Sequence, residues 1–414
     1  KTPSYVCPSR LPSSTFPRQP SKLRCANTGL PMGKSAGDVR EWDEEAYRNT
    51  ILSERELRVK TVFRTAFAPP VAANPGPDVI VVASSDGSVS AYSISSCVAS
   101  AFASSSPRKV LSNNVKDRNS LCETLLSQPL HTNQGHVGPA YDVKFYGSGE
   151  DALLLSCGDD GRVRGWKWRE FLSSEFSPPF EGADLNPILD LVNPQHRGPW
   201  DALSPVPENN AIATNIQEGS IFSAAGDTHA YCWDVETEKL KMIFKGHKDY
   251  LHCIAARKSS NQIITGSEDG TTRIWDCRSG KCTQVIYPEK GDVLKGSSWV
   301  SCIAIDTSES WLVCGTGRSL SVWSLPSCEH IWSIDSYFPM QDVLFHDSQV
   351  LAVGSSAMLT RYNINGMVVS QIHCAPRSAF SVSSHSSGVV AVGGYGGLVD
   401  IISEFGSHLC TVYC

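Results

Sequence analysis

Short runs of apolar residues recur along most of this chain, and turns rich in Gly, Asp and Ser separate them. The clearest example is Ile263–Arg278, which reads IITGSEDGTTRIWDCR. Two β-branched apolar residues lead into small residues, and a second short run ends in Trp-Asp. Asp269-Gly270 favours a tight hairpin between the two runs, because glycine adopts positive φ at no steric cost. The pattern therefore predicts two antiparallel strands of one sheet.

Gly246-His247 precedes this hairpin in the chain. A Gly-His, an Asp-Gly turn and a Trp-Asp within roughly 40–45 residues are typical of one blade of a WD40 β-propeller. The unit recurs, since Trp275 follows Trp233 by 42 residues and precedes Trp323 by 48. We therefore predict an all-β chain, with a seven-bladed WD40 β-propeller over residues 61–414.

Each blade is expected to contain several short strands. They are predicted at 61–68, 79–85 and 88–94; 140–146, 152–157 and 162–168; 211–216, 220–225 and 230–235; within 263–278; 299–305, 311–315 and 319–325; 340–345, 350–354 and 359–364; and 379–383, 389–393, 398–402 and 408–412. The pattern also allows six or eight blades, and it leaves open whether the first or the last strand latches the ring. Residues 95–129 and 169–199 are expected to be irregular surface connections.

The chain begins differently. Residues 1–31 are rich in Pro and Ser and contain no Asp or Glu. We expect a disordered basic extension over residues 1–40, with a natural start at Met32; an organellar transit peptide is the alternative. Residues 41–60 are predicted to form a short helix, because acidic residues crowd its first turns and basic residues its last. This helix is expected either to pack on the propeller or to dock a partner.

The composition of the chain limits the classes of function that it can have. The net charge of −6 gives no general attraction to a phosphate backbone, so contact with RNA is expected only through partners. No apolar run approaches the roughly 18 residues that a membrane helix needs. The 15 cysteines are scattered without a C-x-x-C pair. They are therefore predicted to be mostly buried, reduced thiols of an intracellular protein rather than a disulfide framework or zinc site.

Recurring His, Ser or Thr, Asp and Trp residues are expected to form a hydrogen-bonded chain that pins each turn to its blade. The sets are His136, Ser156, Asp160 and Trp166; His196, Ser223, Asp227 and Trp233; and His247, Thr265 or Ser267, Asp269 and Trp275. A hydrolytic triad would need one strained nucleophile, and no G-x-S-x-G occurs. We therefore predict no enzyme, no catalytic, cofactor-binding or metal-binding residues, and no small-molecule substrate.

The end of the fourth-blade hairpin carries a second signal. Trp275, Asp276 and Arg278 form a W-D-x-R sequence behind the turn residue Asp269. This sequence resembles the DWD box of propellers that bind the adaptor of cullin 4 ubiquitin ligases. A guanidinium at this strand end can pair in a fork with acidic or carbonyl groups. The alternative is an ordinary blade ending with a solvated arginine.

Longer stretches resemble one family, that of THO complex subunit 6, and its plant form above all. They are WDEEAYR at Trp42–Arg48, TVFRTAFAPP at Thr61–Pro70, GPAYDVKFYG at Gly138–Gly147, DALLLSCGDDGRVRGWKWREF at Asp151–Phe171, NPQHRGPW at Asn193–Trp200, and QIHCAP, VVAVGGYGG and FGSHLC further on. The resemblance implies a non-catalytic nuclear subunit of the THO/TREX complex, with other THO/TREX subunits as partners. Its expected roles are mRNA processing, mRNP assembly and nuclear mRNA export. For the plant form it also implies a substrate receptor of a cullin 4 RING ubiquitin ligase.

Overall fold

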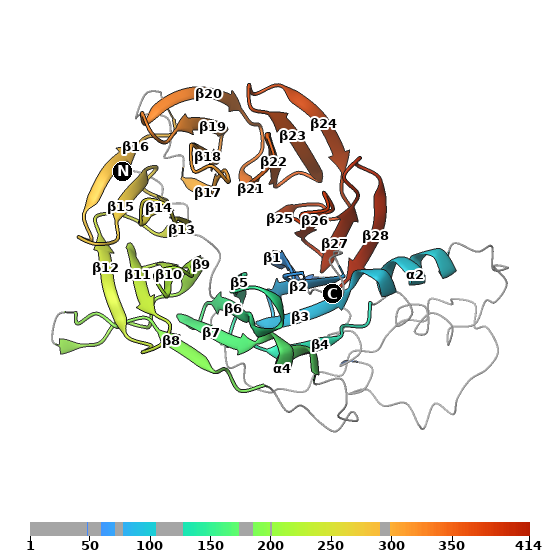
Figure 1. Cartoon of the computed structure of the whole chain (residues 1–414), viewed down its shortest axis with the longest axis horizontal. Helices are drawn as coiled ribbons and strands as arrows, with labels where there is room; N and C mark the ends of the chain where they lie inside the picture. The colour runs from blue at the N-terminus through green and yellow to red at the C-terminus, as the bar shows by residue number, and fades with distance from the viewer. Residues whose placement is uncertain are drawn as a thin grey trace, which may run out of the picture. The chain divides into compact units, whose positions relative to one another are not determined.

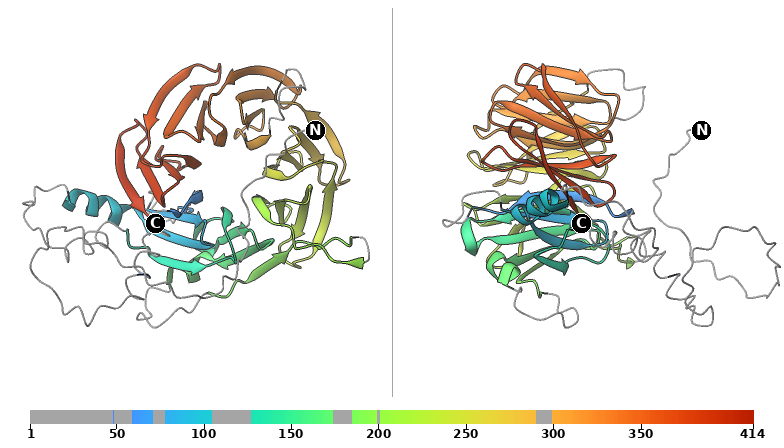
Figure 2. Two further views of the ribbon diagram at one scale, coloured as in Figure 1. Left: turned by 180° about the vertical axis from the view of Figure 1, so that it is seen from behind. Right: turned by 90° about the vertical axis from the view of Figure 1, so that its right-hand side faces the viewer.

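The computed structural model describes Arg48 and residues 59–70, 78–104, 127–173, 185–198, 201–289 and 299–414. Within these ranges the chain forms seven four-stranded antiparallel sheets, which stand as blades around a central axis (Figures 1 and 2). The prediction of an all-β, seven-bladed WD40 propeller is confirmed. The predicted extension over residues 1–40 lies outside the described residues. So does the predicted helix over 41–60, apart from Arg48, Val59 and Lys60.

The blades contain 28 strands in chain order. Blades one to three comprise β1 (Val62–Phe67), β2 (Val79–Ser84), β3 (Ser88–Ser93) and β4 (His131–Gln134); β5 (Ala140–Tyr146), β6 (Leu153–Gly158), β7 (Arg162–Lys167) and β8 (Leu189–Val192); and β9 (Asn209–Asn215), β10 (Ser220–Ala225), β11 (His229–Asp234) and β12 (Leu240–Lys245). Blades four and five comprise β13 (Leu251–Arg257), β14 (Gln262–Ser267), β15 (Thr272–Asp276) and β16 (Cys282–Ile286); and β17 (Val300–Ile305), β18 (Trp311–Thr316), β19 (Ser319–Ser324) and β20 (Glu329–Asp335). Blades six and seven comprise β21 (Met340–His346), β22 (Gln349–Gly354), β23 (Met358–Asn363) and β24 (Val368–His373); and β25 (Ala379–Ser384), β26 (Val390–Gly394), β27 (Leu398–Ile402) and β28 (His408–Tyr413).

Among the described strands, the ring closes without a latch strand. Every blade consists of four consecutive strands, with the first strand nearest the axis, so none of these sheets mixes strands from the two ends of the chain. β1 instead lies beside β25 of the last blade (Figure 1). The backbone N–H of Thr65 donates to the Ser381 hydroxyl at 2.9 Å, and that of Gly396 donates to the Lys60 carbonyl at 2.9 Å.

A largely buried ion cluster spans the central channel. The Arg64 guanidinium on β1 lies 3.1 Å from the Asp142 carboxylate on β5 and 2.5 Å from the Asp342 carboxylate on β21. The same carboxylates accept the backbone N–H groups of Ile212 and Val382, each at 2.8 Å, from the next blade. Burial favours a lower pKa for Arg64, but the two carboxylates raise it above its usual value. Arg64 is therefore a permanent cation that joins blades one, two and six.

The degree of burial explains which strands could be predicted from the apolar pattern of the sequence. The second strands β2, β6, β14, β18 and β22 have five consecutive buried residues, because a neighbouring blade covers each face of the sheet. They therefore appear as continuous apolar runs. The fourth strands lie outermost and are more exposed, as in β20, which alternates between half-buried and exposed positions. The apolar pattern missed these fourth strands except β28.

The two predicted irregular connections are wrong in part. The first contains helix α2 (Ile94–Ser104), which packs beside β28. The second contains helix α4 (Trp168–Ser173) and strand β8. Trp168 and Phe171 are both buried, and the Trp168 ring packs edge-on against Phe145 of β5 with ring centroids 5.0 Å apart, so apolar contact with the blade holds α4 in place. Residues 105–126 and 174–184 lie outside the described ranges.

Two further sequence expectations concern the cysteines and the membrane. All 12 cysteines in the described segments are free, and seven of them are buried. Burial raises the pKa of thiols such as Cys314 and Cys410 to about 12. Among the described helices, none has the length and apolar character needed to cross a bilayer.

Candidate functional site

The hairpin turns between the second and third strands of the blades share one face of the ring with the connections from blade to blade. We call this the turn face. The His and Asp residues of the predicted sets lie here, because the Asp belongs to the hairpin turn and the His to the incoming connection. The connections between the third and fourth strands, including the turn that contains Arg278, lie on the opposite face.

The fourth-blade set is closed and buried. His247 Nδ1 lies 2.9 Å from the Asp269 carboxylate, and His247 Nε2 lies 2.8 Å from the Thr265 hydroxyl. Trp275 Nε1 donates to the same hydroxyl at 2.8 Å. Of the two residues that the sequence left open, Thr265 is the strand member, because it is the diagonal cross-strand neighbour of Trp275. Ser267 takes another role and donates to the Asp249 carbonyl at 3.0 Å.

The second-blade set is complete except for its tryptophan. His136 Nδ1 lies 2.8 Å from Asp160, and His136 Nε2 lies 2.7 Å from the Ser156 hydroxyl. Trp166 Nε1 does not bind Ser156 and donates to the Leu185 carbonyl at 3.0 Å. This corrects the prediction, since the segment after residue 184 returns along the blade and presents a competing acceptor.

Burial argues against chemistry at these two sets. Ser156 and Thr265 are fully buried, and His136 and His247 are buried as well. A substrate carbonyl has no path to either hydroxyl, although a triad nucleophile must reach one. The two sets therefore act as pins that hold the hairpin turn to the strand behind it.

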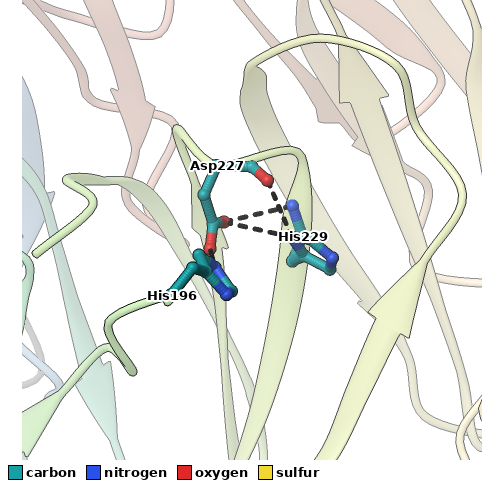
Figure 3. A group of neighbouring side chains, drawn as sticks. All are labelled: His196, Asp227 and His229. Atoms are coloured by element: carbon teal, nitrogen blue, oxygen red, sulfur yellow. Dashed lines mark hydrogen bonds and ion pairs between the residues drawn. The ribbon is translucent and has the colours of Figure 1, made fainter. Parts of the chain in front are cut away.

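The third-blade set is assembled differently (Figure 3). His196 Nε2 lies 2.5 Å from the Asp227 carboxylate, but His196 does not reach Ser223. The Tyr231 hydroxyl takes the place of the strand hydroxyl and donates to Asp227. Ser223 accepts only a long hydrogen bond from Trp233, at 3.4 Å. The predicted four-residue chain is therefore broken in this blade, because a tyrosine from β11 intervenes.

A second imidazole lies at this turn, and the sequence prediction missed it. His229 Nδ1 lies 2.7 Å from the Asp227 backbone carbonyl and 3.6 Å from its carboxylate. His229 stands where the fourth blade has Thr271, and aligning the two hairpins on their Asp residues would have revealed it. Burial favours a higher pKa for Asp227, but hydrogen bonds from His229, Tyr231 and His196 lower it to about 2. The hydrogen bond to Asp227 in turn raises the pKa of His229.

The W-D-x-R residues divide between the two faces. Asp269 and Trp275 belong to the buried pin, whereas Asp276 and Arg278 lie on the opposite face. The Asp276 carboxylate accepts the Arg278 N–H at 3.2 Å and the Ser279 hydroxyl at 2.7 Å, and these bonds shape the turn. Arg278 is exposed, and its guanidinium forms no ion pair with any of the described residues.

The equivalent positions of two other blades differ from this arrangement. In the second blade Arg169 is also exposed, but it forms an ion pair with Glu150 at 2.7 Å. Lys167 takes the place of the acidic residue there and pairs with Glu170 at 3.0 Å. The third blade has Glu236 where the box requires a basic residue. Of these three strand ends, only that of the fourth blade therefore offers the box residues with an arginine that is not engaged in an ion pair.

Exposed apolar side chains lie on the outer strands of blades six and seven. Val368 and Val369 on β24 are each about half exposed, and Leu409 and Tyr413 on β28 are more than a third exposed. Phe405, in the turn that leads into β28, is 91% exposed. β24 and β28 are the outermost strands of neighbouring blades (Figure 1). We call these five exposed residues on two neighbouring blades the rim patch, and exposed apolar side chains of this kind can contribute to protein binding.

Comparison with known proteins identifies the relatives of this chain. The WD domain, G-beta repeat family matches residues 127–167, 238–276 and 288–324. THO complex subunit 6 of Arabidopsis thaliana is 54% identical over 377 residues, which cover 91% of this chain and 98% of that protein. THO complex subunit 6 of Homo sapiens is 29% identical over 259 residues, covering 62% and 70% of the two chains. The THO complex subunit 6 homolog of Danio rerio is 27% identical over 289 residues, covering 67% and 82%.

Proposed function

The chain belongs to the THO complex subunit 6 family, and from this we propose that it is a non-catalytic assembly subunit of the THO/TREX complex. In this role it acts in the nucleus, in mRNA processing, mRNP assembly and mRNA export. The observation that carries the proposal is the 54% identity to the Arabidopsis relative over nearly the whole of both chains. A match of that extent includes the blade connections as well as the strands that any propeller needs.

The surface properties support a role in assembly. A closed ring of seven sheets is rigid and presents a broad area for partners. The rim patch supplies apolar contact area on the outside of blades six and seven. The net charge of −6 gives no general attraction to RNA, so RNA is reached through the other THO/TREX subunits.

A second function is supported by the fourth-blade strand end. Arg278 is exposed beside Asp276 and forms no ion pair within the described structure, which leaves the five N–H donors of its guanidinium for a partner. We propose as the alternative role that Asp269, Trp275, Asp276 and Arg278 form a DWD box that binds the cullin 4 ligase adaptor. The protein would then also act as a substrate receptor in protein ubiquitination. The two roles are compatible, because the rim patch and Arg278 lie on different blades.

One experiment tests both proposals. The full-length protein is purified by affinity from nuclear extract and its partners are identified by mass spectrometry, with wild type beside Arg278→Ala and Arg169→Ala. Arg169→Ala is the matched control, since it removes an exposed arginine at the equivalent strand end that already has an ion-pair partner. We expect all three forms to recover THO subunits. We expect the adaptor to accompany wild type and Arg169→Ala and to be lost from Arg278→Ala.

Other outcomes would overturn one proposal or both. If no form recovers THO subunits, the assembly role is wrong. If the adaptor is absent from wild type, or is recovered equally by Arg278→Ala, the ligase role is wrong and the W-D-x-R sequence is an ordinary blade ending. The two results are independent of each other.

A further inference from the structure

The third-blade turn brings together two histidines and one aspartate, whereas the fourth-blade set has only one histidine. His196, Asp227 and His229 each offer one ligand atom, and these atoms lie within 4.8 Å of one another. The rings of the two histidines are 5.4 Å apart between centroids and inclined by 34°. Figure 3 shows the Asp227 carboxylate facing both imidazoles. Two imidazoles and one carboxylate are a ligand set for first-row transition metals.

We propose that His196, Asp227 and His229 bind one divalent transition-metal ion of the zinc type, with water completing its coordination. The sequence pattern predicted no metal ligands, so the site is new, and it is independent of the proposed THO and ligase roles. Soft thiolate ligands are not involved, and the nitrogen and oxygen donors favour zinc over magnesium or calcium.

The comparison with the fourth blade shows why this set is not simply another pin. There the third position holds Thr271, whose hydroxyl donates to Asp269 at 2.6 Å and closes the turn. The side chain of His247 is 1% exposed, whereas that of His196 is 42% exposed. An ion therefore has access to the third-blade set from solvent, but not to the fourth-blade set.

The distances fit a metal site after a small adjustment. Ligand atoms about 2 Å from a tetrahedral ion lie roughly 3.3 Å from one another. His229 Nδ1 lies 3.6 Å from Asp227 Oδ1, but it also donates to the Asp227 backbone carbonyl at 2.7 Å, so it must give up that proton and hydrogen bond to bind the ion. The distance of 2.5 Å between His196 Nε2 and the same carboxylate must lengthen by about 1 Å. His196 belongs to a blade connection rather than a strand, so its side chain can make that shift.

Neighbouring groups hold the carboxylate in position. The Tyr231 hydroxyl and the His229 backbone N–H both donate to Asp227. Outer hydrogen bonds of this kind orient metal ligands and strengthen their binding. Thr228, between the two ligands on the hairpin, has a positive φ of 74° where the second and fourth blades have glycine. A β-branched residue is strained in that conformation, and a bound ion would offset the strain.

A bound ion would fasten a connection between blades to the blade that follows it. His196 lies in the connection between blades two and three, where its carbonyl accepts the Ser204 N–H at 2.8 Å. Asp227 and His229 belong to the hairpin of blade three. Metal binding would therefore fasten this connection to the third blade on the turn face.

The test uses the full-length protein without a polyhistidine tag, freed of metal by a chelator. Co²⁺ is titrated while its visible absorption is recorded, and Zn²⁺ is then added to displace it. We expect one equivalent of Co²⁺ to bind wild type with bands typical of nitrogen and oxygen ligands. His196→Asn and His229→Asn should weaken binding at least about tenfold, as loss of even a ligand's supporting partner does at metal sites.

His252→Asn is the matched control, because His252 also faces a carboxylate, at 3.5 Å from Glu268 in the fourth blade, but without a second histidine in its set. It should bind Co²⁺ as wild type does. His196→Asn changes only the connection, so it tests the site even if the hairpin variant fails to fold. The proposal is overturned if wild type binds no Co²⁺ in a saturable way, or if both variants bind it equally well. A thiolate charge-transfer band would also overturn it, by placing the ion on a cysteine.

Discussion

The third and fourth blades have the same hairpin pattern, yet their turns differ in chemistry. In the fourth blade one histidine, one threonine and one aspartate form a closed, buried set around Trp275. In the third blade Tyr231 and a second histidine surround the aspartate, and the set opens to solvent. Tyr231 and His229 thus distinguish a candidate ligand site from a structural pin that has the same hairpin pattern. A repeat motif therefore predicts the position of its residues, whereas their neighbours decide the chemistry.

Removing the turn carboxylates should have the largest effect. Asp269→Ala deletes the acceptor for His247, for the Lys248 N–H and for Thr271, all within 3.0 Å. Because buried donors are then left unpaired, we expect about 3 kcal/mol lower free energy of unfolding. Asp227→Ala should lower it by about 1–2 kcal/mol, since its partners can reach water. Urea unfolding of both variants measures the difference, and equal losses would contradict the distinction between buried and open sets.

Removing the strand hydroxyls should show the same order at a smaller scale. Thr265→Val keeps the shape but leaves Trp275 Nε1 without an acceptor and His247 Nε2 without the hydroxyl donor, so we expect a loss of about 2 kcal/mol. Ser223→Ala removes only one long hydrogen bond, of 3.4 Å, and should lower the free energy of unfolding by less than about 1 kcal/mol. Chemical denaturation distinguishes the two. A Ser223→Ala loss as large as that of Thr265→Val would mean that the third blade is pinned like the fourth.

The two turn histidines should respond to pH in opposite directions. Burial lowers the pKa of His247, so its contribution to stability is present above pH 6.5 and is lost as the pH falls through the folded pKa. The hydrogen bond to Asp227 raises the pKa of His229, so its contribution is present below pH 6.5 and is lost as the pH rises through the folded value. NMR titration of the imidazoles, assigned with His229→Asn, measures both values in metal-free protein. A His229 pKa below that of His247 would refute the prediction.

The smallest effect is expected on the face opposite the pins. Arg278→Ala removes an exposed side chain that has no ion-pair partner in the described structure, so the free energy of unfolding should change by less than about 0.5 kcal/mol. Arg169→Ala breaks an exposed pair with Glu150 and should also lower it by under about 1 kcal/mol. Thermal unfolding tests this. A large loss in Arg278→Ala would show that the fourth-blade strand end is structural and would complicate its use as a binding variant.

Much of the ring was predictable, because its signals are local. The Asp-Gly turns, the spaced tryptophans and the continuous apolar second strands all indicate blades within a few dozen residues of sequence. The apolar pattern did not predict strands such as β20, because these strands lie outermost and their residues alternate between half-buried and exposed positions. Helix α2 was not predicted because its sequence is rich in Ser and resembles that of a loop. In the structure, Ile94 is buried against the first and last blades.

The candidate sites were predictable only in part. The sequence identified His247, Asp269 and Trp275 correctly as neighbours, because strand register determines which side chains meet across a hairpin. It did not predict that Trp166 would turn to the Leu185 carbonyl. That choice depends on a segment that returns to the blade from a distance, which no local pattern encodes.

The sequence alone thus encodes the repeat, the blade order and the residues available at every turn, since these follow from periodicity and backbone preference. How the ring closes depends instead on tertiary contacts, with Arg64 of the first blade reaching Asp142 and Asp342 across the channel. The same contacts determine which turn is sealed and which is open. The physical reason is that burial, which sets both the strength of an ion pair and the access of a ligand, depends on residues far apart in the chain.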